Sequence, residues 1–531
     1  MLGVEAARMP LPADALALAR GVICVGFDGS SVTNAPLDAL RAFGPGAVIL
    51  FGRNVGTTDE LRELVAALRA IASPAPLIAV DQEGGRVERL RHGVAPLPSA
   101  MAVGAAGDVA LTQRLGMLLG RDLARLGVTV DLAPVADLAL QPGSRVIGTR
   151  AYGDDPERVA AFAGAFARGL ERSGVAAALK HFPGHGSTAG DSHVGLPRVT
   201  AGAATLRARD LVPFARSIAA RDSSIVLTAH VVVEAFDAQR PATLSRAILT
   251  DLLRGELGFD GVIATDCLEM DAIAAGIGTA RGALEALAAG ADLLLISHHL
   301  ELAHAAADGI VAAVHAGRIP LGRLQEAYAR VHALRERCGS HPRPAAEAID
   351  EHAPLEAAQR AVTAVAGEPR LRAGKPVTVI SFEGQLSDNA ATSGRATRPA
   401  DAPSLSGALR TRGWKSEVMR VPLDPAEEDV DLLLEHVPAL GDREFVVVTR
   451  DAHLSPAQTE AVARILGLAP DALIVSARSP FDARLWPAAR RVICIYGDGG
   501  IALEGCADVL SGRAPLRGTL PVHLNGTAAV R

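Results

Sequence analysis

The sequence contains few cysteines, and none of them has the spacing of a metal site or a disulfide framework. Its five cysteines, Cys24, Cys267, Cys338, Cys494 and Cys506, are scattered over 531 residues without a CxxC pair. Three stand in or beside apolar runs, where a free cysteine behaves as a small buried hydrophobe. An odd number without a framework fits a reducing compartment, so we expect unpaired thiols and a cytoplasmic protein.

Excess basic charge and long hydrophobic runs are also lacking. The formal net charge is −6 and the isoelectric point is near 6.2. These values give no support to nucleic acid or an anionic membrane as a partner, because both select a basic face. No apolar run reaches the roughly 18 to 20 residues that span a bilayer, and residues 1–20 lack the apolar core of a signal peptide. We therefore expect a soluble protein with neither a nucleic-acid nor a membrane partner.

Short apolar runs alternate with amphipathic stretches through the first 300 residues. The stretches 58–72, 156–173 and 244–257 carry apolar residues at helical spacing. The short runs are continuously apolar, which favours a parallel sheet covered on both faces. Eight such runs predict a (β/α)8 TIM-like barrel over residues 1–335. The predicted strands are Gly21–Phe27, Ala47–Phe51, Leu77–Val80, Val128–Ala133, Ala176–Lys180, Ser224–Ala229, Gly261–Thr265 and Ala291–Ile296.

A second α/β pattern follows a predicted linker at residues 336–374, within which 355–365 reads as a helix. We predict an αβα sandwich domain over residues 375–531, with a helix at 456–466. A Gly-Asp-Gly-Gly stretch at 497–500 lacks the Lys-Ser/Thr ending of a phosphate loop, so a plain turn is expected there. The predicted strands of this domain are Val377–Phe382, Phe445–Thr449, Leu473–Ala477 and Val492–Tyr496.

Polar residues follow most of the predicted barrel strands. In a (β/α)8 barrel the carboxyl ends of all strands lie on one face, where active sites are built. Residues some 200 positions apart in the chain are therefore expected to converge. The polar stretches begin at Arg53, Asp81, Pro134, Lys180, His230, Asp266 and Ser297.

The segment 180–193 has the densest chemistry in the chain. It reads KHFPGHGSTAGDSH and holds Lys180, one of only three lysines, with three histidines and one aspartate. His185, Asp191 and His193 would suit a metal, although no HExxH spacing is present and Lys180 would repel a cation. The alternative is that Asp191 orients His193, whose imidazole transfers a proton near neutral pH. We favour the second interpretation and expect no metal and no cofactor.

The residues alone leave two alternatives open for His181 and His185, and two for Asp266. His181 and His185 are either functional or bond backbone carbonyls in a tight turn. Asp266 ends an apolar strand, where a carboxylate either caps a helix or serves as a nucleophile. The barrel context favours the nucleophile, and the residues 267–270 that follow read as packing.

A cluster of charged residues follows the third strand. Asp81, Arg86 and Arg89 provide an acceptor and donors, and Arg150 and Lys180 add donors from later strand ends. Such a set suits a polyhydroxylated ligand, because a carboxylate accepts from vicinal hydroxyls and cations donate to ring and hydroxyl oxygens. Glu83 either ties its own loop to Arg86 or touches the ligand.

Three of these segments together resemble glycoside hydrolase family 3, and within it the bacterial exo-β-N-acetylglucosaminidases. They are Lys180–His193, Val80–Val87 and Thr265–Asp266, supported by 133–137, 147–150, 228–230 and 241–245. The resemblance covers most of residues 20–300, and the later domain resembles the αβα domain of two-domain members. Two departures are Ser187 and Cys267, where many relatives have aspartate, and neither removes a catalytic group.

The resemblance implies a retaining glycosidase. Asp266 would be the nucleophile, and His193, paired with Asp191, the general acid/base. The residues implied to hold the sugar are Asp81, Arg89, Arg150, Lys180 and His181, with His230 close by.

The implied substrate is a small oligosaccharide of the cell-wall or chitin type, or a muropeptide, from which terminal N-acetylglucosamine is released. A phosphorylase is a rival, because a histidine acid/base leaves the site without a second anion and lets phosphate approach. A β-glucosidase is another, with Glu383 of the second domain as acid/base. An inactive sugar-binding protein is the third alternative.

Overall fold

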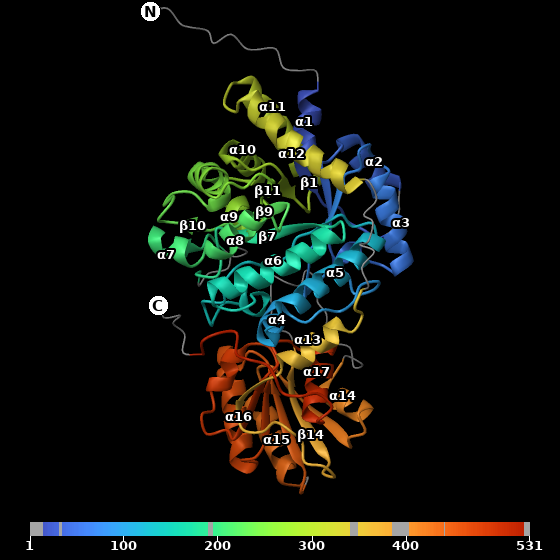
Figure 1. Ribbon diagram of the computed structural model, residues 1–531, viewed down its shortest axis with the longest axis vertical. Helices are drawn as coiled ribbons and strands as arrows, with labels where there is room; N and C mark the ends of the chain where they lie inside the picture. The colour runs from blue at the N-terminus through green and yellow to red at the C-terminus, as the bar shows by residue number, and fades with distance from the viewer. Residues whose placement is uncertain are drawn as a thin grey trace, which may run out of the picture.

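The structure is a computed structural model that describes residues 14–30, 34–188, 195–339, 349–384, 403–439 and 441–524. Two α/β units are stacked along the long axis of the molecule, the N-terminal one in blue to yellow and the C-terminal one in orange to red (Figure 1). The predicted fold class is confirmed. Within the described ranges, no helix is both long and apolar enough to cross a membrane.

The N-terminal unit is a parallel barrel. Its eight strands lie in the order β11-β9-β7-β6-β3-β2-β1-β12, and a parallel bridge between Ala264 and Leu293 nearly closes the sheet. Each of the eight predicted runs contains a strand whose side chains are all buried, as a sheet covered on both faces requires. The strands are β1 Ile23–Val25, β2 Ala47–Leu50, β3 Leu77–Val80, β6 Val130–Asp131, β7 Ala176–Phe182, β9 Ile225–Thr228, β11 Val262–Ala264 and β12 Leu294–Ile296.

Two of the predicted barrel helices form close to the predicted limits, as α3 (Thr58–Arg69) and α6 (Pro156–Arg172). The start of α6 is fixed by the Asp155 side chain, which accepts from the Arg158 backbone N–H. The stretch 244–257 differs from the prediction. It forms a wider π-helical segment, η4 (Ala247–Glu256), because periodicity alone does not distinguish i→i+5 from i→i+4 bonding.

The C-terminal unit is built on a six-stranded sheet in the order β13-β18-β17-β16-β14-β15. Its four predicted strands are confirmed, and two were missed: β13 (Thr363–Ala366) and β15 (Ser416–Pro422). β15 pairs along one edge only and is half exposed, so its sequence is not a continuous apolar run. The four predicted strands are β14 Val377–Glu383, β16 Glu444–Thr449, β17 Leu473–Ser476 and β18 Arg491–Cys494.

β13 corrects the prediction of a helix over 355–365. The helix α13 (Ala353–Ala361) ends early, and the chain then turns into a strand that pairs antiparallel with β18. Val362, Thr363 and Val365 are β-branched, and such residues favour extended backbone over helix.

Helices cover both faces of this sheet, as the predicted αβα sandwich requires. α14 (Leu405–Thr411) and α17 (Gly500–Leu510) contribute to the apolar cluster on one face. α15 (Glu427–Ala439) and α16 (Pro456–Leu468) contribute to the cluster on the other.

The two units share one apolar cluster across their contact. Met101, Val146 and Ile147 of the barrel belong to the same cluster as Phe481 and Val522 of the C-terminal unit. The barrel loops at this contact are therefore packed from both sides.

Elements also run past the predicted domain limits, since α12 (Leu321–Gly339) continues beyond residue 335 and β13 lies inside the predicted linker.

Candidate active site

The carboxyl ends of the barrel strands surround a cavity of about 430 Å³, a volume suited to a small ligand. Asp81 follows β3, Lys180 and His181 lie near the end of β7, and Asp266 follows β11. The convergence expected from the sequence is therefore observed. The predicted site residues that line this cavity are Asp81, Arg89, Arg150, Lys180, His181 and Asp266.

A buried cluster of ion pairs lines one side of the cavity. The Lys180 Nζ lies 2.8 Å from Oδ1 of Asp81 and 2.6 Å from Oε1 of Glu83. Arg150 donates to both oxygens of Glu83, with Nε 2.8 Å from Oε2 and Nη2 2.7 Å from Oε1. Glu83 thus holds two cations side by side, and Asp81, which pairs with Lys180, also lines the cavity.

Charge pairing decides the ionisation of this cluster. Burial raises the pKa of Glu83, but Arg150 and Lys180 outweigh that effect and hold its pKa well below the ordinary range. Burial likewise lowers the pKa of Lys180, and the carboxylates of Asp81 and Glu83 reverse the effect and raise it. Glu83 therefore stays an anion and Lys180 a cation at neutral pH.

Glu83 was expected either to tie its loop to Arg86 or to touch the ligand, and it lines the cavity. Glu83 bonds Lys180 and Arg150 rather than tying its loop to Arg86, whose guanidinium donates to the backbone carbonyl of Arg145. The position of Glu83 two residues after Asp81 was a signal for the site. Its partners lie in the short helix η2 (Gly148–Arg150) and in β7, 67 and 97 residues further along the chain, and only the fold identifies them.

Asp137 is a site residue that the sequence did not single out. Its Oδ2 lies 2.6 Å from Nδ1 of His181, and its Oδ1 accepts from the backbone N–H of His185 at 2.6 Å. Burial raises the pKa of Asp137, but His181 and His185 outweigh it and lower the pKa below its ordinary value. Asp137 therefore fixes both the ring of His181 and the turn that follows β7.

The two histidines of this turn line the cavity. Nε2 of His181 faces Nη2 of Arg150 at 3.4 Å, so Nδ1 carries the hydrogen that is donated to Asp137. Nδ1 of His185 lies 2.8 Å from the Thr188 hydroxyl, and burial lowers the pKa of His185 to about 4. The alternative of rings bonded only to backbone carbonyls does not describe either histidine.

Asp266 stands at the end of β11 with its carboxylate in the cavity wall. Its Oδ1 accepts from the backbone N–H of Cys267 at 2.7 Å. The nearest helix, α9 (Asp271–Ala274), is preceded by Met270 at its cap position, so Asp266 is not a helix cap. This position in the cavity wall is compatible with the predicted role of Asp266 as the nucleophile.

His230 takes a different position from the other predicted binding residues. Its ring is buried, with Nδ1 2.8 Å from the Thr243 hydroxyl and Nε2 2.9 Å from the carbonyl oxygen of Cys267. Among the described residues that line the cavity, His230 does not occur. It supports the backbone directly after Asp266, and its contact with substrate stays a prediction.

Residues 267–270 are only partly the packing that the sequence suggested. Leu268 is fully buried, whereas Cys267, Glu269 and Met270 line the cavity. The Cys267 sulfur lies 2.8 Å from the Ser297 hydroxyl, and this contact joins the loop after β11 to the one after β12. Chain periodicity does not reveal which of four consecutive loop residues turns inward.

The predicted acid/base pair, Asp191 and His193, lies outside the described residues, which end at Thr188 and resume at Gly195. The described base of this loop is held firmly. The Ser187 hydroxyl contacts Asp210 and lies 2.9 Å from a guanidinium nitrogen of Arg209.

Comparison with known proteins assigns the barrel to a family. Residues 33–334 match the family described as "Glycosyl hydrolase family 3 N terminal domain". A beta-hexosaminidase of Chromobacterium violaceum is 43% identical over 295 residues, covering 54% of this chain and 82% of that protein. One from Pseudomonas aeruginosa is 42% identical over 309 residues, covering 58% of this chain and 90% of that protein.

The likeness extends to the second domain in a solved structure. A glycoside hydrolase family 3 beta-N-acetylglucosaminidase from Paenibacillus sp. strain FPU-7 matches with a TM-score of 0.88 and 34% identity, covering 98% of this chain and 100% of that one. A beta-glucoside phosphorylase shares the fold, with a TM-score of 0.75 at 21% identity. The protein is a glycoside hydrolase. It belongs to glycosyl hydrolase family 3.

Proposed function

We propose that the protein is a retaining exo-β-N-acetylglucosaminidase. Beta-hexosaminidase activity is supported by relatives about 42% identical over the barrel. The observation that carries the proposal is the single cavity in which the Asp266 carboxylate shares the wall with Asp81, Arg150 and Lys180. One part of this cavity suits sugar hydroxyls and the other presents a carboxylate, as a glycosidase of this mechanism needs.

The reaction is a double displacement. A carboxylate oxygen of Asp266 attacks the anomeric carbon while His193 gives a proton to the departing glycosidic oxygen, so that the C–O bond breaks and a glycosyl ester forms. His193 then takes a proton from water, whose oxygen attacks the same carbon and releases Asp266. Two inversions at one carbon return the β-anomer. Asp191 orients the imidazole and favours its protonated form.

The ion-pair cluster gives the sugar its orientation. Asp81 accepts from hydroxyl groups, and Lys180, Arg150 and Arg89 donate to them. His181, fixed by Asp137, adds a ring edge whose direction is set before the sugar arrives. Because Glu83 holds the cations in place without substrate, little reorganisation is needed on binding.

The proposed substrates are cell-wall-derived or chitin-type oligosaccharides and muropeptides with a terminal β-N-acetylglucosamine, in the cytoplasm. The test is a comparison of kcat/KM for aryl β-N-acetylglucosaminide and aryl β-glucoside, each with and without phosphate. We expect preference for the N-acetylglucosaminide, with free sugar as the product in both buffers. Preference for the glucoside would contradict the sugar assignment, and sugar 1-phosphate as the main product would make the enzyme a phosphorylase.

The β-glucosidase alternative assigned the acid/base role to Glu383. In the structure Glu383 lies at the end of β14, where its carboxylate accepts from the Ser381 hydroxyl at 2.9 Å and faces Arg420 Nε at 3.2 Å. It is not among the described residues that line the cavity. These contacts favour His193 over Glu383 as the proton donor.

Replacing His193 by Ala separates proton transfer from nucleophilic attack. For a disaccharide, whose leaving group needs a proton, we expect kcat/KM to fall about 10²- to 10⁴-fold. For a dinitrophenyl β-N-acetylglucosaminide, which leaves without a proton, kcat/KM should fall far less. His315→Ala, at the exposed end of α11 (Leu300–His315), is the control. Equal losses on both substrates, or no loss on either, would contradict the assignment.

A further inference from the structure

The segment 141–150 lies between the sugar cavity and the C-terminal domain, and hydrogen bonds link it turn by turn. The Ser144 N–H donates to the Gln141 carbonyl at 3.0 Å, and the Ile147 N–H donates to the Ser144 hydroxyl at 3.2 Å. The Arg150 N–H then donates to the Ile147 carbonyl at 2.9 Å. These bonds connect Gln141 to Arg150 through successive turns.

Arg150 is also tied back to its own segment. Its Nη1 donates to the Val146 carbonyl at 2.8 Å, while Nε and Nη2 bind Glu83 at the cavity floor. The direction of this guanidinium depends on two supports: the carboxylate of Glu83 and the backbone of residues 146–150. The position of the backbone of residues 146–150 depends in turn on the contacts that this segment makes with the C-terminal domain.

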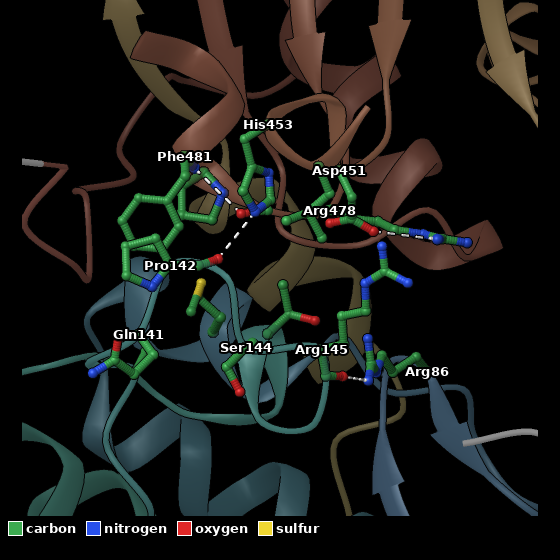
Figure 2. A pocket seen from close by; sticks show the side chains of 16 residues that line it. Arg86, Gln141, Pro142, Ser144, Arg145, Asp451, His453, Arg478 and Phe481 are labelled. Carbon is green, nitrogen blue, oxygen red and sulfur yellow. Dashed lines mark hydrogen bonds and ion pairs between the residues drawn. The ribbon is translucent and has the colours of Figure 1, made fainter. Parts of the chain in front are cut away.

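The C-terminal domain holds it through His453, in the short helix η5 (Ala452–Leu454). The His453 Nε2 lies 3.0 Å from the carbonyl oxygen of Pro142, and Nδ1 lies 2.8 Å from Oδ1 of Asp482. Figure 2 shows the ring above this loop, with a dashed line to Pro142. A small cavity of about 30 Å³ borders the contact.

The two contacts define the protonation of His453. A backbone carbonyl only accepts hydrogen bonds, and an ionised carboxylate does the same. We therefore assign a hydrogen to both ring nitrogens, which makes the ring an imidazolium. Asp482 is fully buried and also accepts from the Thr449 hydroxyl at 2.9 Å, as expected of a carboxylate.

The charged groups around His453 support this state. Burial lowers its pKa, but Asp482 and then Asp451 outweigh burial and raise it above the ordinary value. Arg478 lies 3.4 Å from Asp451, and Arg86 also faces Asp451 from the barrel side, so that part of the acidic charge is balanced. The ring of Phe481 lies beside the imidazole with centroids 6.2 Å apart.

We propose that the C-terminal domain completes the sugar site from outside, with doubly protonated His453 positioning Arg150 through the hydrogen-bonded turns of residues 141–150. His453 is not among the described residues that line the cavity, and it acts on the reaction only through Arg150. The inference rests on the proposed function to the extent that Arg150 binds the sugar. It gives the second domain a role in substrate binding.

Two variants of His453 test the proposal. His453→Phe keeps an aromatic ring and removes both N–H donors, and His453→Gln keeps one polar contact but carries no charge. For each we expect KM to rise roughly 10-fold to 100-fold at pH 6 with a smaller change in kcat, because a displaced binding group weakens substrate orientation. His436→Phe is the matched control, since His436 is exposed on α15 and bonds the Leu432 carbonyl of its own helix at 2.7 Å. An unchanged KM in both His453 variants would overturn the proposal.

The pH dependence separates the charge of His453 from the packing of its ring. Neutral His453 keeps a single N–H, which the Asp482 carboxylate retains at Nδ1, so the Nε2–H bond to Pro142 is present below the raised pKa of His453 and is lost as the pH rises through it. The ratio of wild-type to variant kcat/KM should therefore be largest in acid and approach one in alkali, whatever other groups titrate. A ratio independent of pH would mean that the ring only packs, and would contradict the proposal.

A double-mutant cycle tests the route through Arg150. In an Arg150→Lys background, which keeps the charge but loses the fixed fork, His453→Phe should have little further effect on KM. Additive losses would show that His453 acts elsewhere. The cycle is measured on whichever β-glycoside the wild type cleaves fastest, so a wrong assignment of the sugar leaves its outcome interpretable. Thermal unfolding of each variant checks that it is folded.

Discussion

Asp266→Asn is expected to lower kcat for an aryl β-N-acetylglucosaminide by about 10³-fold or more, the scale seen when a hydrolase loses its nucleophile. The amide occupies the same place at the end of β11 and can still accept the Cys267 N–H bond. It cannot attack the anomeric carbon, so no glycosyl ester forms. KM should change much less, since the sugar-binding cluster is untouched. Steady-state kinetics on both proteins give the result.

The control for this variant is Asp260→Asn, an exposed residue at the opposite end of the same strand, which should retain full activity. Chemical rescue adds a second readout. In Asp266→Ala, azide can enter the vacated position, attack the anomeric carbon and leave an α-glycosyl azide as the product. Residual activity within about tenfold of the wild type, or a β-azide product, would contradict Asp266 as the nucleophile.

Glu83→Gln is expected to have the largest effect on stability. The substitution leaves Lys180 and Arg150 buried beside a neutral amide, and breaking one partner of a buried ion pair costs about 3–5 kcal/mol of unfolding free energy. Sugar binding should weaken as well, because the two cations repel each other without Glu83. Denaturant unfolding and KM, measured on the same preparation, test both consequences.

A matched control and the pH dependence sharpen this test. Glu234 pairs with Arg198 at 2.8 Å on the surface, and Glu234→Gln should cost less than about 1 kcal/mol. The pKa of Glu83 is lowered in the folded protein, so its stabilisation is fully present above the unfolded pKa of about 4.3 and is lost progressively as the pH falls from there towards the lowered folded pKa. If the difference in unfolding free energy between the wild type and Glu83→Gln persisted unchanged at acid pH, that result would contradict a charge effect.

The barrel could be predicted from the sequence because each strand is a separate, continuously apolar run. Burial on both faces requires such a run, and its helical neighbours show a different period. β15 was missed because an edge strand is half exposed and carries polar residues. β13 was missed because it directly follows α13, and the change from helix to strand occurs within two residues.

The site was predictable only in part. Lys180, Asp81 and Asp266 stand at strand ends, and the barrel rule brings such residues together wherever they lie in the chain. Glu83 and Asp137 act through partners on distant elements of the chain, and a single sequence does not pair them. His453 is further still from prediction, because its contact crosses from one domain to the other, more than 300 residues along the chain.

Covalent trapping tests the central claim most directly. A 5-fluoro-β-N-acetylglucosaminyl fluoride should transfer its sugar to the enzyme with loss of fluoride from the anomeric carbon, and the 5-fluorine slows release of the ester. After proteolysis, mass spectrometry should find one labelled peptide, with the sugar on Asp266. Labelling of another cavity carboxylate such as Glu269 or Asp271, or inactivation without any covalent label, would contradict the mechanism.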